Sequence, residues 1–186
     1  MIMSEKSFSS LKISLIIILC GAAIIFFWLR FVKESPEKIA RKYPSETGWM
    51  MVCDTEEHTL TVFMQSEDAA PGEWKPIVYN TFPCSTGRAI MENGKYETCT
   101  PKGATYIRWK QKTHLFREFK SWYNCWMKGG KFAIHSVLYD RDESIASQKV
   151  DGRLGVDSSS GCIRVDLKVA KWIYRTLPVN TPLVVY

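Results

Sequence analysis

The segment SSSGCIRV, Ser158 to Val165, places Cys162 directly after hydroxyl side chains and a glycine. A cysteine thiolate with a lowered pKa is a strong nucleophile, and successive backbone N–H groups in a tight turn can receive the oxyanion that forms when it attacks a carbonyl. A buried structural cysteine is the alternative, because free cysteine is among the most buried residue types. The choice between the two depends on whether the chain also supplies a base.

Three histidines are available to take a proton from Cys162. His58 lies in a predicted turn and His114 in a basic segment, which is typical of surface residues, although His114 stays a second candidate. His135 ends the run KFAIHS, whose alternation predicts a strand, and it comes before the Ser-Gly-Cys turn. A pair of Cys162 and His135 is therefore the favoured interpretation.

The chain from Gly48 onward consists of short β-rich runs separated by turn signals such as Asn93-Gly94. Strands are predicted at residues 49–54, 59–64, 76–83, 105–109, 131–136 and 182–186. One clear helix follows Cys162, with Asp166 as its N-cap, apolar residues at helical spacing and Pro178 as its stop. This domain is therefore predicted to be mostly β.

The N-terminal run ISLIIILCGAAIIFFWL, residues 13–29, carries no charge and reaches the lower limit for a membrane-spanning helix. A cleaved signal peptide is the alternative, because small residues lie within the run. The run continues past them, so we predict an uncleaved single-pass anchor at 13–29 after a short tail at 1–12. Basic residues are more numerous after the span than before it, which by itself would place the C-terminal part in the cytoplasm.

A linker or stalk is predicted at residues 30–47, where Ser35-Pro36-Glu37 starts a short helix that runs to about Tyr43. The remaining residues, 48–186, form one predicted domain. The length of 186 residues and the apolar fraction of 46% are sufficient for a packed core.

The formal charge of +6 is spread mildly along the chain, except that Lys102–Lys131 holds eight basic residues against the single acid Glu118. Aromatic residues interleaved with this charge would suit single-stranded nucleic acid. A solvated face over a core, or a cleft for a substrate that carries carboxylates, describes the segment better. No nucleic acid partner is therefore expected.

The predicted domain contains five cysteines. Outside the membrane, two disulfides would leave one free thiol, and the nucleophile is the thiol that function would keep. Cys84 and Cys99 bracket the Asn93-Gly94 turn, so we predict a bridge between them, with a fully reduced set as the alternative. Zinc is disfavoured because the chain has no CxxC pair, and no cofactor is expected.

Four ordered motifs connect these observations: CSTG at 84–87, TPKG at 100–103, IHS at 134–136 and SSGCIRV at 159–165. Together they resemble the L,D-transpeptidase catalytic domain, also called the YkuD domain, over roughly residues 48–186. The resemblance implies a mostly β, sandwich-like fold with one main helix after the catalytic cysteine. It also implies an enzyme that acts on peptidoglycan stem peptides, with its domain outside the cytoplasmic membrane.

The resemblance also implies roles for single residues. Cys162 matches the nucleophile, His135 the general base, and Ser136 the residue whose backbone carbonyl orients the imidazole. A His N–H held by a carbonyl fixes the tautomer that can accept the thiol proton. The implied reaction transfers an acyl group from a tetrapeptide stem to an amine, with release of D-alanine and formation of a 3-3 cross-link.

The turn itself supplies the remaining implied roles. Backbone N–H groups at Ser160, Gly161 and Cys162 match the oxyanion site, and Arg164 matches a polar position that holds the loop or a substrate carboxylate. Two features depart from the family pattern. Ser160 stands where a second histidine is usual, and the 23 residues between His135 and the SSGC motif exceed the usual gap, which predicts an extra loop beside the cleft.

Other functions are weighed against this one. Hydrolysis of the same bond would make the chain an L,D-carboxypeptidase, and the missing histidine keeps open a catalytically silent wall-binding module. Peptidases of the NlpC/P60 type place the cysteine before the histidine, and sortases carry a TLxTC pattern that is absent here. Both classes are therefore disfavoured.

Overall fold

The computed structural model describes residues 33–92, 95–116, 118–142 and 149–186, and residues 35–186 form one compact unit. The predicted tail at 1–12 and the predicted anchor at 13–29 lie outside the described residues. Among the residues that are described, no helix is long and apolar enough to cross a membrane.

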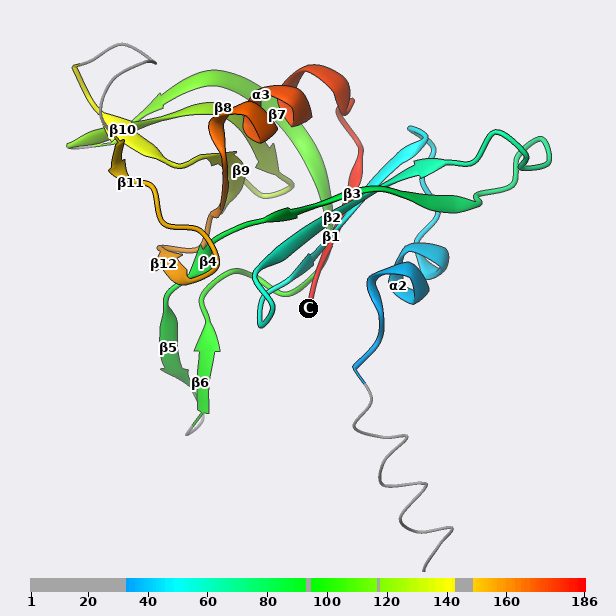
Figure 1. Ribbon diagram of the computed structural model, residues 1–186, viewed down its shortest axis with the longest axis horizontal. Coiled ribbons are helices and arrows are strands. Elements are labelled where there is room, and N and C mark those ends of the chain that lie inside the picture. Colours follow the sequence, from blue (N-terminus) through cyan, green and yellow to red (C-terminus); the bar gives the residue numbers. More distant parts are fainter. Residues whose placement is uncertain (1–32, 93–94, 117, 143–148) are drawn as a thin grey trace, which may run out of the picture. The chain divides into compact units, whose positions relative to one another are not determined.

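One large curled sheet makes up most of the unit (Figure 1). Its strands are β1 (Trp49–Asp54), β2 (Thr59–Gln65), β3 (Pro76–Pro83), β7 (Gly103–Leu115), β8 (Phe119–Met127), β9 (Ala133–Ser136), β10 (Leu138–Asp140), β11 (Lys149–Asp151), β13 (Ile163–Val165) and β14 (Pro182–Val185). The main path runs β11-β10-β8-β7-β14-β1-β2-β3, while β9 pairs with β8 and with β13. In place of the expected sandwich, the described residues form one curled sheet of ten strands, with two short ladders beside it.

Two short ladders complete the strand set. β4 (Thr86–Gly87) pairs in parallel with β12 (Asp157–Ser159), and β5 (Ala89–Glu92) pairs with β6 (Lys95–Thr98). The first ladder joins the CSTG motif to the segment that precedes the cysteine. Two sequence motifs that lie about seventy residues apart are therefore adjacent in space.

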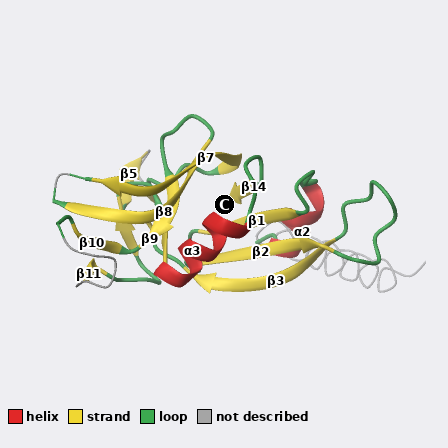
Figure 2. Ribbon diagram, turned by 90° about the horizontal axis from the view of Figure 1, so that it is seen from above, coloured by secondary structure: helices red, strands yellow, loops and turns green. Residues whose placement is uncertain are grey.

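The helix α3 (Leu167–Thr176) packs against β8 and β9 of the large sheet (Figure 2). As predicted, Asp166 caps it, accepting a 2.9 Å hydrogen bond from the Lys168 N–H. Its buried residues Ala170 and Ile173 join the main apolar cluster. At the other end, the Lys110 ammonium donates to main-chain carbonyls of the last turn, where a positive charge is favourable.

The predicted stalk helix is present as α2 (Pro36–Lys42), capped by Ser35, but it does not stand apart from the domain. Ile39 and Ala40 are buried in a second apolar cluster with residues of the sheet. The Trp74 indole N–H donates to the Ala40 carbonyl at 2.8 Å. The burial of this apolar face explains why the compact unit begins at Ser35 rather than at Gly48.

Candidate active site

The candidate nucleophile and base lie where β13 pairs in parallel with β9. Arg164 is opposite His135 in this register, so Cys162, two residues earlier, comes level with Ala133. Because paired residues of neighbouring strands project to the same face, the side chains of Arg164 and His135 lie on one face of the pair, and Cys162 directly precedes β13. The sheet register therefore places the turn that carries the predicted thiol next to the strand that carries the predicted base.

His135 is 2% exposed, and its Nδ1 lies 2.6 Å from the Ser136 carbonyl oxygen. A carbonyl only accepts hydrogen bonds, so Nδ1 must carry the proton and donate, which leaves Nε2 as the acceptor. Burial lowers the pKa of His135 to about 4, against the opposing effect of the Ser136 hydrogen bond. The imidazole is therefore neutral at pH 7, the state that a general base requires, and the predicted Ser136 contact is present.

Cys162 is partly exposed at the surface of the site. Burial raises the pKa of its thiol, while a hydrogen bond at the Ala133 backbone and the positive charge of Arg164 lower it. The sequence predicted a nucleophile with a lowered pKa, so the structure differs from that expectation. A thiol that is neutral at rest needs a base at the moment of attack, and a neutral imidazole is a side chain that can serve as one.

Ser159 closes the turn before the cysteine, a role that sequence reasoning missed. Its hydroxyl donates to the Cys162 carbonyl at 2.6 Å and accepts from the Gly161 N–H at 3.0 Å. Gly161 has a φ of 123°, and a Cβ there would lie 3.2 Å from the Cys99 carbonyl oxygen. Because the Gly161 N–H is already bonded, the predicted oxyanion site narrows to the N–H groups of Ser160 and Cys162.

Arg164 is 7% exposed and binds within the protein. Its Nη1 donates to Asp151 at 2.7 Å and lies 3.4 Å from the Ser158 hydroxyl. Hydrogen bonds from Arg153, with a further contribution from Arg164, lower the pKa of Asp151 to about 2. Of the two roles predicted for Arg164, the structure favours holding the loop. The sequence analysis did not predict the role of Asp151, because this residue lies in the long segment between His135 and the SSGC motif and its pairing with Arg164 depends on how that segment folds.

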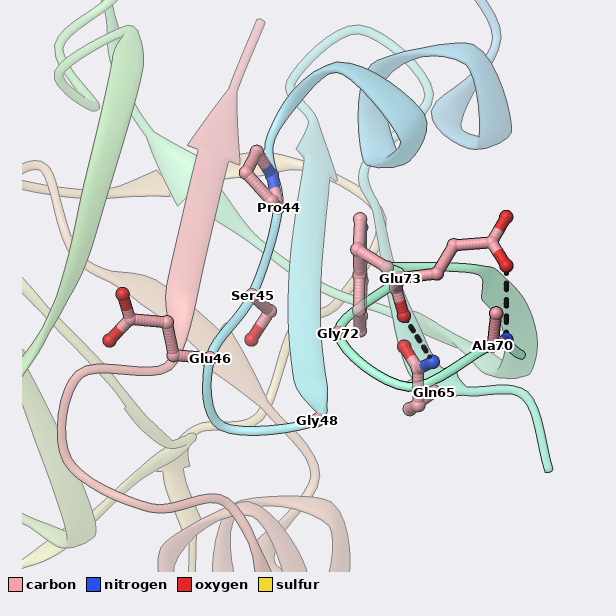
Figure 3. Close-up of a pocket in the computed structure, with 9 residues that line it drawn as sticks. Pro44, Ser45, Glu46, Gly48, Gln65, Ala70, Gly72 and Glu73 are labelled. Atoms are coloured by element: carbon pink, nitrogen blue, oxygen red, sulfur yellow. Dashed lines mark hydrogen bonds between the residues drawn. The ribbon is translucent and has the colours of Figure 1, made fainter.

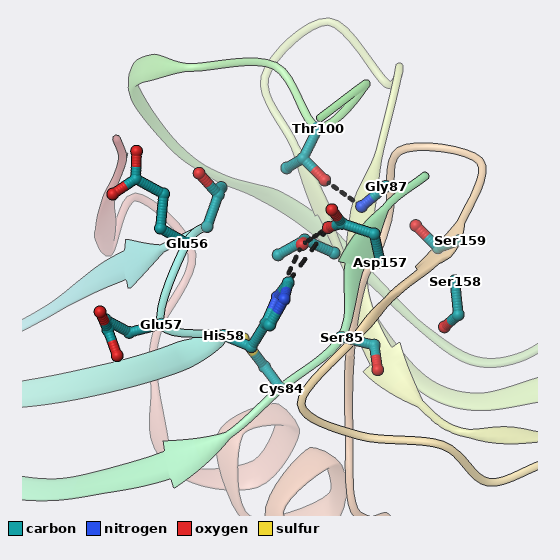
Figure 4. Close-up of polar contacts among 12 residues, drawn as sticks. Glu56, Glu57, His58, Cys84, Ser85, Gly87, Thr100, Asp157, Ser158 and Ser159 are labelled. Atoms are coloured by element: carbon teal, nitrogen blue, oxygen red, sulfur yellow. Dashed lines mark hydrogen bonds and ion pairs between the residues drawn. The ribbon is translucent and has the colours of Figure 1, made fainter. Parts of the chain in front are cut away.

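The CSTG and TPKG motifs meet the cysteine turn at one place (Figure 4). Ser85 and Arg164 exchange two backbone hydrogen bonds of 2.8 Å. The Gly87 N–H donates to the Thr100 hydroxyl at 2.7 Å, and a Cβ on Gly87 would lie only 2.5 Å from the Cys99 sulfur. The glycine of CSTG is therefore required for this close packing.

A family model described as the L,D-transpeptidase catalytic domain, YkuD, matches residues 49–185. The chain belongs to this family. The Bacillus subtilis protein YciB, whose own name assigns it provisionally to the L,D-transpeptidases, is 30% identical over an alignment of 93 positions, which covers 48% of this chain and 47% of YciB. The chain thus spans about half the length of this curated relative.

Solved structures show the same architecture. A fused Zn-dependent amidase/peptidase/peptidoglycan-binding domain-containing protein from Clostridium acetobutylicum is 26% identical with a TM-score of 0.57, over 81% of this chain and 57% of that one. An L,D-transpeptidase from Stackebrandtia nassauensis has a TM-score of 0.50 at 20% identity, over 77% and 58% of the respective chains. The second likeness is one of fold.

His58 supports the transpeptidase fold around CSTG rather than lying free on the surface. The Thr86 hydroxyl donates to Asp157 at 2.5 Å and lies 3.3 Å from His58 Nδ1, and Figure 4 shows the His58 ring directed toward Asp157. The ring nitrogen is 3.9 Å from the Asp157 carboxylate. This group ties the β1–β2 turn to the β4–β12 ladder.

The predicted bridge between Cys84 and Cys99 is absent from the structure, in which both cysteines are free. The Cys84 sulfur lies 4.0 Å from that of Cys53, and the Cys99 sulfur lies 3.9 Å from the Ser159 carbonyl. The pairing of β2 with both β1 and β3 brings Cys84 back beside Cys53. Spacing along the chain could not reveal this contact.

The aromatic end of the β7–β8 hairpin lies beside the candidate base. The His114 ring packs 4.8 Å from that of Phe116 and 5.1 Å from that of Trp126, measured between centroids. The Phe116 centroid is 6.2 Å from that of His135. His114 is thus part of an aromatic cluster next to the site, and no contact that is described joins it to Cys162.

A pocket of about 520 Å³ opens elsewhere, between the segment that follows α2 and the β2–β3 loop (Figure 3). Its lining residues are Pro44, Ser45, Glu46, Gly48, Gln65, Ala70, Gly72, Glu73 and Trp74. None of the four sequence motifs contributes to it.

Proposed function

We propose that this chain is a peptidoglycan L,D-transpeptidase in which Cys162 is the nucleophile and His135 the general base. One observation carries the proposal: the Ser136 carbonyl fixes His135 Nδ1 as a donor, on the strand that pairs with β13 directly after Cys162. Membership of the family supports the same conclusion.

The first half of the reaction acylates the cysteine. His135 Nε2 takes the thiol proton while sulfur attacks the carbonyl carbon of the third stem residue, which is bonded to the D-alanine nitrogen. The C–N bond then breaks, the departing D-alanine nitrogen takes the proton from His135, and a thioester remains. The N–H groups of Ser160 and Cys162 stabilise the oxyanion, and Arg164 favours the thiolate over the neutral thiol.

The second half transfers the acyl group to an amine. An amine of a neighbouring stem attacks the thioester carbon, gives its proton to His135, and forms the 3-3 cross-link as the Cys162 thiolate departs and is reprotonated. Water in place of the amine would give L,D-carboxypeptidase activity, which the partial exposure of Cys162 allows. The aromatic cluster around Phe116 favours transfer by limiting access of water to His135.

We further propose that residues 13–29 anchor the chain as a single-pass protein, with the catalytic domain on the side of the membrane that faces the cell wall. The apolar run and the location of the substrate support this assignment. Protease added to intact cells should remove the domain, whereas complete protection would contradict the assignment.

The reaction is tested with the full-length protein and a disaccharide tetrapeptide, with and without an acceptor amine. We expect mass spectrometry to detect free D-alanine and a product joined to the acceptor. Released D-alanine without a joined product would indicate the carboxypeptidase. No turnover in either case would contradict both enzymes and leave the wall-binding module.

A further inference from the structure

The outer side of the cysteine turn carries an arginine that the reaction described above does not use. Arg88, directly after CSTG, is exposed, and its Nη2 lies 3.5 Å from the hydroxyl of Ser160, which is also exposed. A guanidinium therefore stands beside the position at which the family usually has a histidine.

The backbone of Arg88 is fixed although its side chain is exposed. Its N–H donates to the Ser159 carbonyl at 2.8 Å, and its carbonyl accepts from the Cys99 N–H at 3.1 Å. These two bonds tie the Arg88 main chain to Ser159 in the turn and to Cys99, which follows β6. The contact with Ser160 is at the long limit of a hydrogen bond, so it steadies the guanidinium without saturating its five donors.

The two arginines of the site differ in what they hold. Arg164 is buried and binds the Asp151 carboxylate inside the protein. Arg88 directs the same planar fork of donors toward solvent, at the rim of the turn that presents Cys162. A planar guanidinium binds carboxylates through paired, charge-assisted hydrogen bonds.

We propose that Arg88 is a specificity-determining residue that binds a carboxylate of the donor stem peptide next to the bond that Cys162 attacks. This inference rests on the proposed function. Two carboxylates of the substrate lie close to the bond that is attacked. They are the terminal carboxylate of the departing D-alanine and the side-chain carboxylate of a diaminopimelate third residue. Neutralising either carboxylate separately distinguishes them.

Binding is measured on full-length Cys162→Ala protein, with and without Arg88→Gln, so that the result does not depend on turnover. The probes are tetrapeptide stems with lysine or diaminopimelate in the third position, each with a C-terminal carboxylate or amide. We expect Arg88→Gln to weaken binding about tenfold for peptides that carry the recognised carboxylate, as the loss of one charge-assisted contact predicts. Peptides that lack this carboxylate should bind both proteins equally.

The matched control is Arg175→Gln, which removes the same charge from an exposed position on α3. It should leave all four affinities unchanged, and Arg88→Lys should recover part of the lost affinity. Equal affinities before and after Arg88→Gln, or an equal loss for every peptide, would overturn the inference.

Turnover is measured separately, with Cys162 present. There we expect Arg88→Gln to raise KM about tenfold for the same peptides, with little change in kcat. Absence of turnover in the unsubstituted protein would overturn the proposed function, while the binding pattern would still decide the role of Arg88.

Discussion

The two sides of the turn at Ser158–Cys162 are built differently. On the inner side, β9 and β13 hold His135 at 2% exposure and Arg164 at 7%, and each side chain is bonded to the protein. On the outer side, Arg88 and Ser160 are exposed and contact each other only at 3.5 Å.

We interpret this difference as a separation between the groups proposed for catalysis and the group proposed for the choice of substrate. The inner side fixes the tautomer of His135 and the charge near Cys162 through packing and short hydrogen bonds, so it must be preorganised. The outer side keeps donors available for a ligand. We expect substitutions on the inner side to affect kcat or folding, and substitutions on the outer side to affect KM.

The largest effect is expected from the reacting pair itself. Cys162→Ala should lower turnover at least about 10⁴-fold, and His135→Gln about 10³-fold, because nucleophile and base act as one unit. His114→Gln is the control and should leave turnover within about threefold, since its ring packs against Phe116 and Trp126. A loss for His114→Gln as large as that for His135→Gln would contradict the choice of base.

The burial of His135 also predicts how stability depends on pH. Its pKa of about 4 in the folded chain lies below the value of about 6.5 in the unfolded chain. The unfolded state therefore binds more protons between these values, so this contribution is complete above about pH 6.5 and is lost as pH falls toward 4.

The expected loss at pH 4.5 is about 2.5 kcal/mol, measured by denaturant unfolding at pH 7 and pH 4.5. His135→Gln removes the titrating group and should flatten this part of the pH dependence. An unchanged dependence in that variant would mean that other groups cause the acid destabilisation.

The buried ion pair of the inner side gives a smaller effect. Asp151→Asn leaves Arg164 without its counter-charge and should lower the free energy of unfolding by about 2 kcal/mol. The matched control is Asp68→Asn, whose partner Lys75 is exposed, and thermal denaturation should show no change for it. Equal destabilisation by the two variants would show that the burial of the Arg164–Asp151 pair does not increase its contribution to stability.

The smallest of these effects concerns the turn backbone. Gly161→Ala places a Cβ 3.2 Å from the Cys99 carbonyl at a φ of 123° and should lower kcat about tenfold. Gly72→Ala imposes a left-handed residue at a φ of 80° with open space around it, so it should lose stability and retain turnover. A kcat for Gly161→Ala equal to that of the unsubstituted protein would show that the turn tolerates the shift.

Local signals in the sequence predicted the elements that depend on local physics. β1 and β3 begin and end where predicted, and the caps Ser35 and Asp166 start α2 and α3. By contrast, β8 was missed. Most of its residues are buried on both faces of the strand, so its sequence does not alternate between apolar and polar residues, and Tyr123 within it has a φ of 56°. Helix caps act locally, whereas this strand depends on its neighbours.

The candidate site divides in the same way. Cys162, His135 and Ser136 were predicted because they lie in short motifs, and the register of β9 and β13 places His135 and Ser136 opposite the residues that follow Cys162. Asp151 and the contact between Cys53 and Cys84 depend on pairing between distant segments, which spacing in the sequence does not encode. Ser159 carried a local signal, a serine two residues before a glycine, that was not used.

The central claim is that the inner side delivers the Cys162 thiol to an acyl carbonyl. It is tested most directly by incubating the full-length protein with a carbapenem, whose lactam carbonyl is an acyl donor, followed by intact-mass measurement and peptide mapping. We predict one adduct per chain, carried by the peptide that contains Cys162, and none in Cys162→Ala, which keeps the other cysteines. An adduct on another cysteine, or an unmodified chain that still releases D-alanine from the tetrapeptide, would contradict the account.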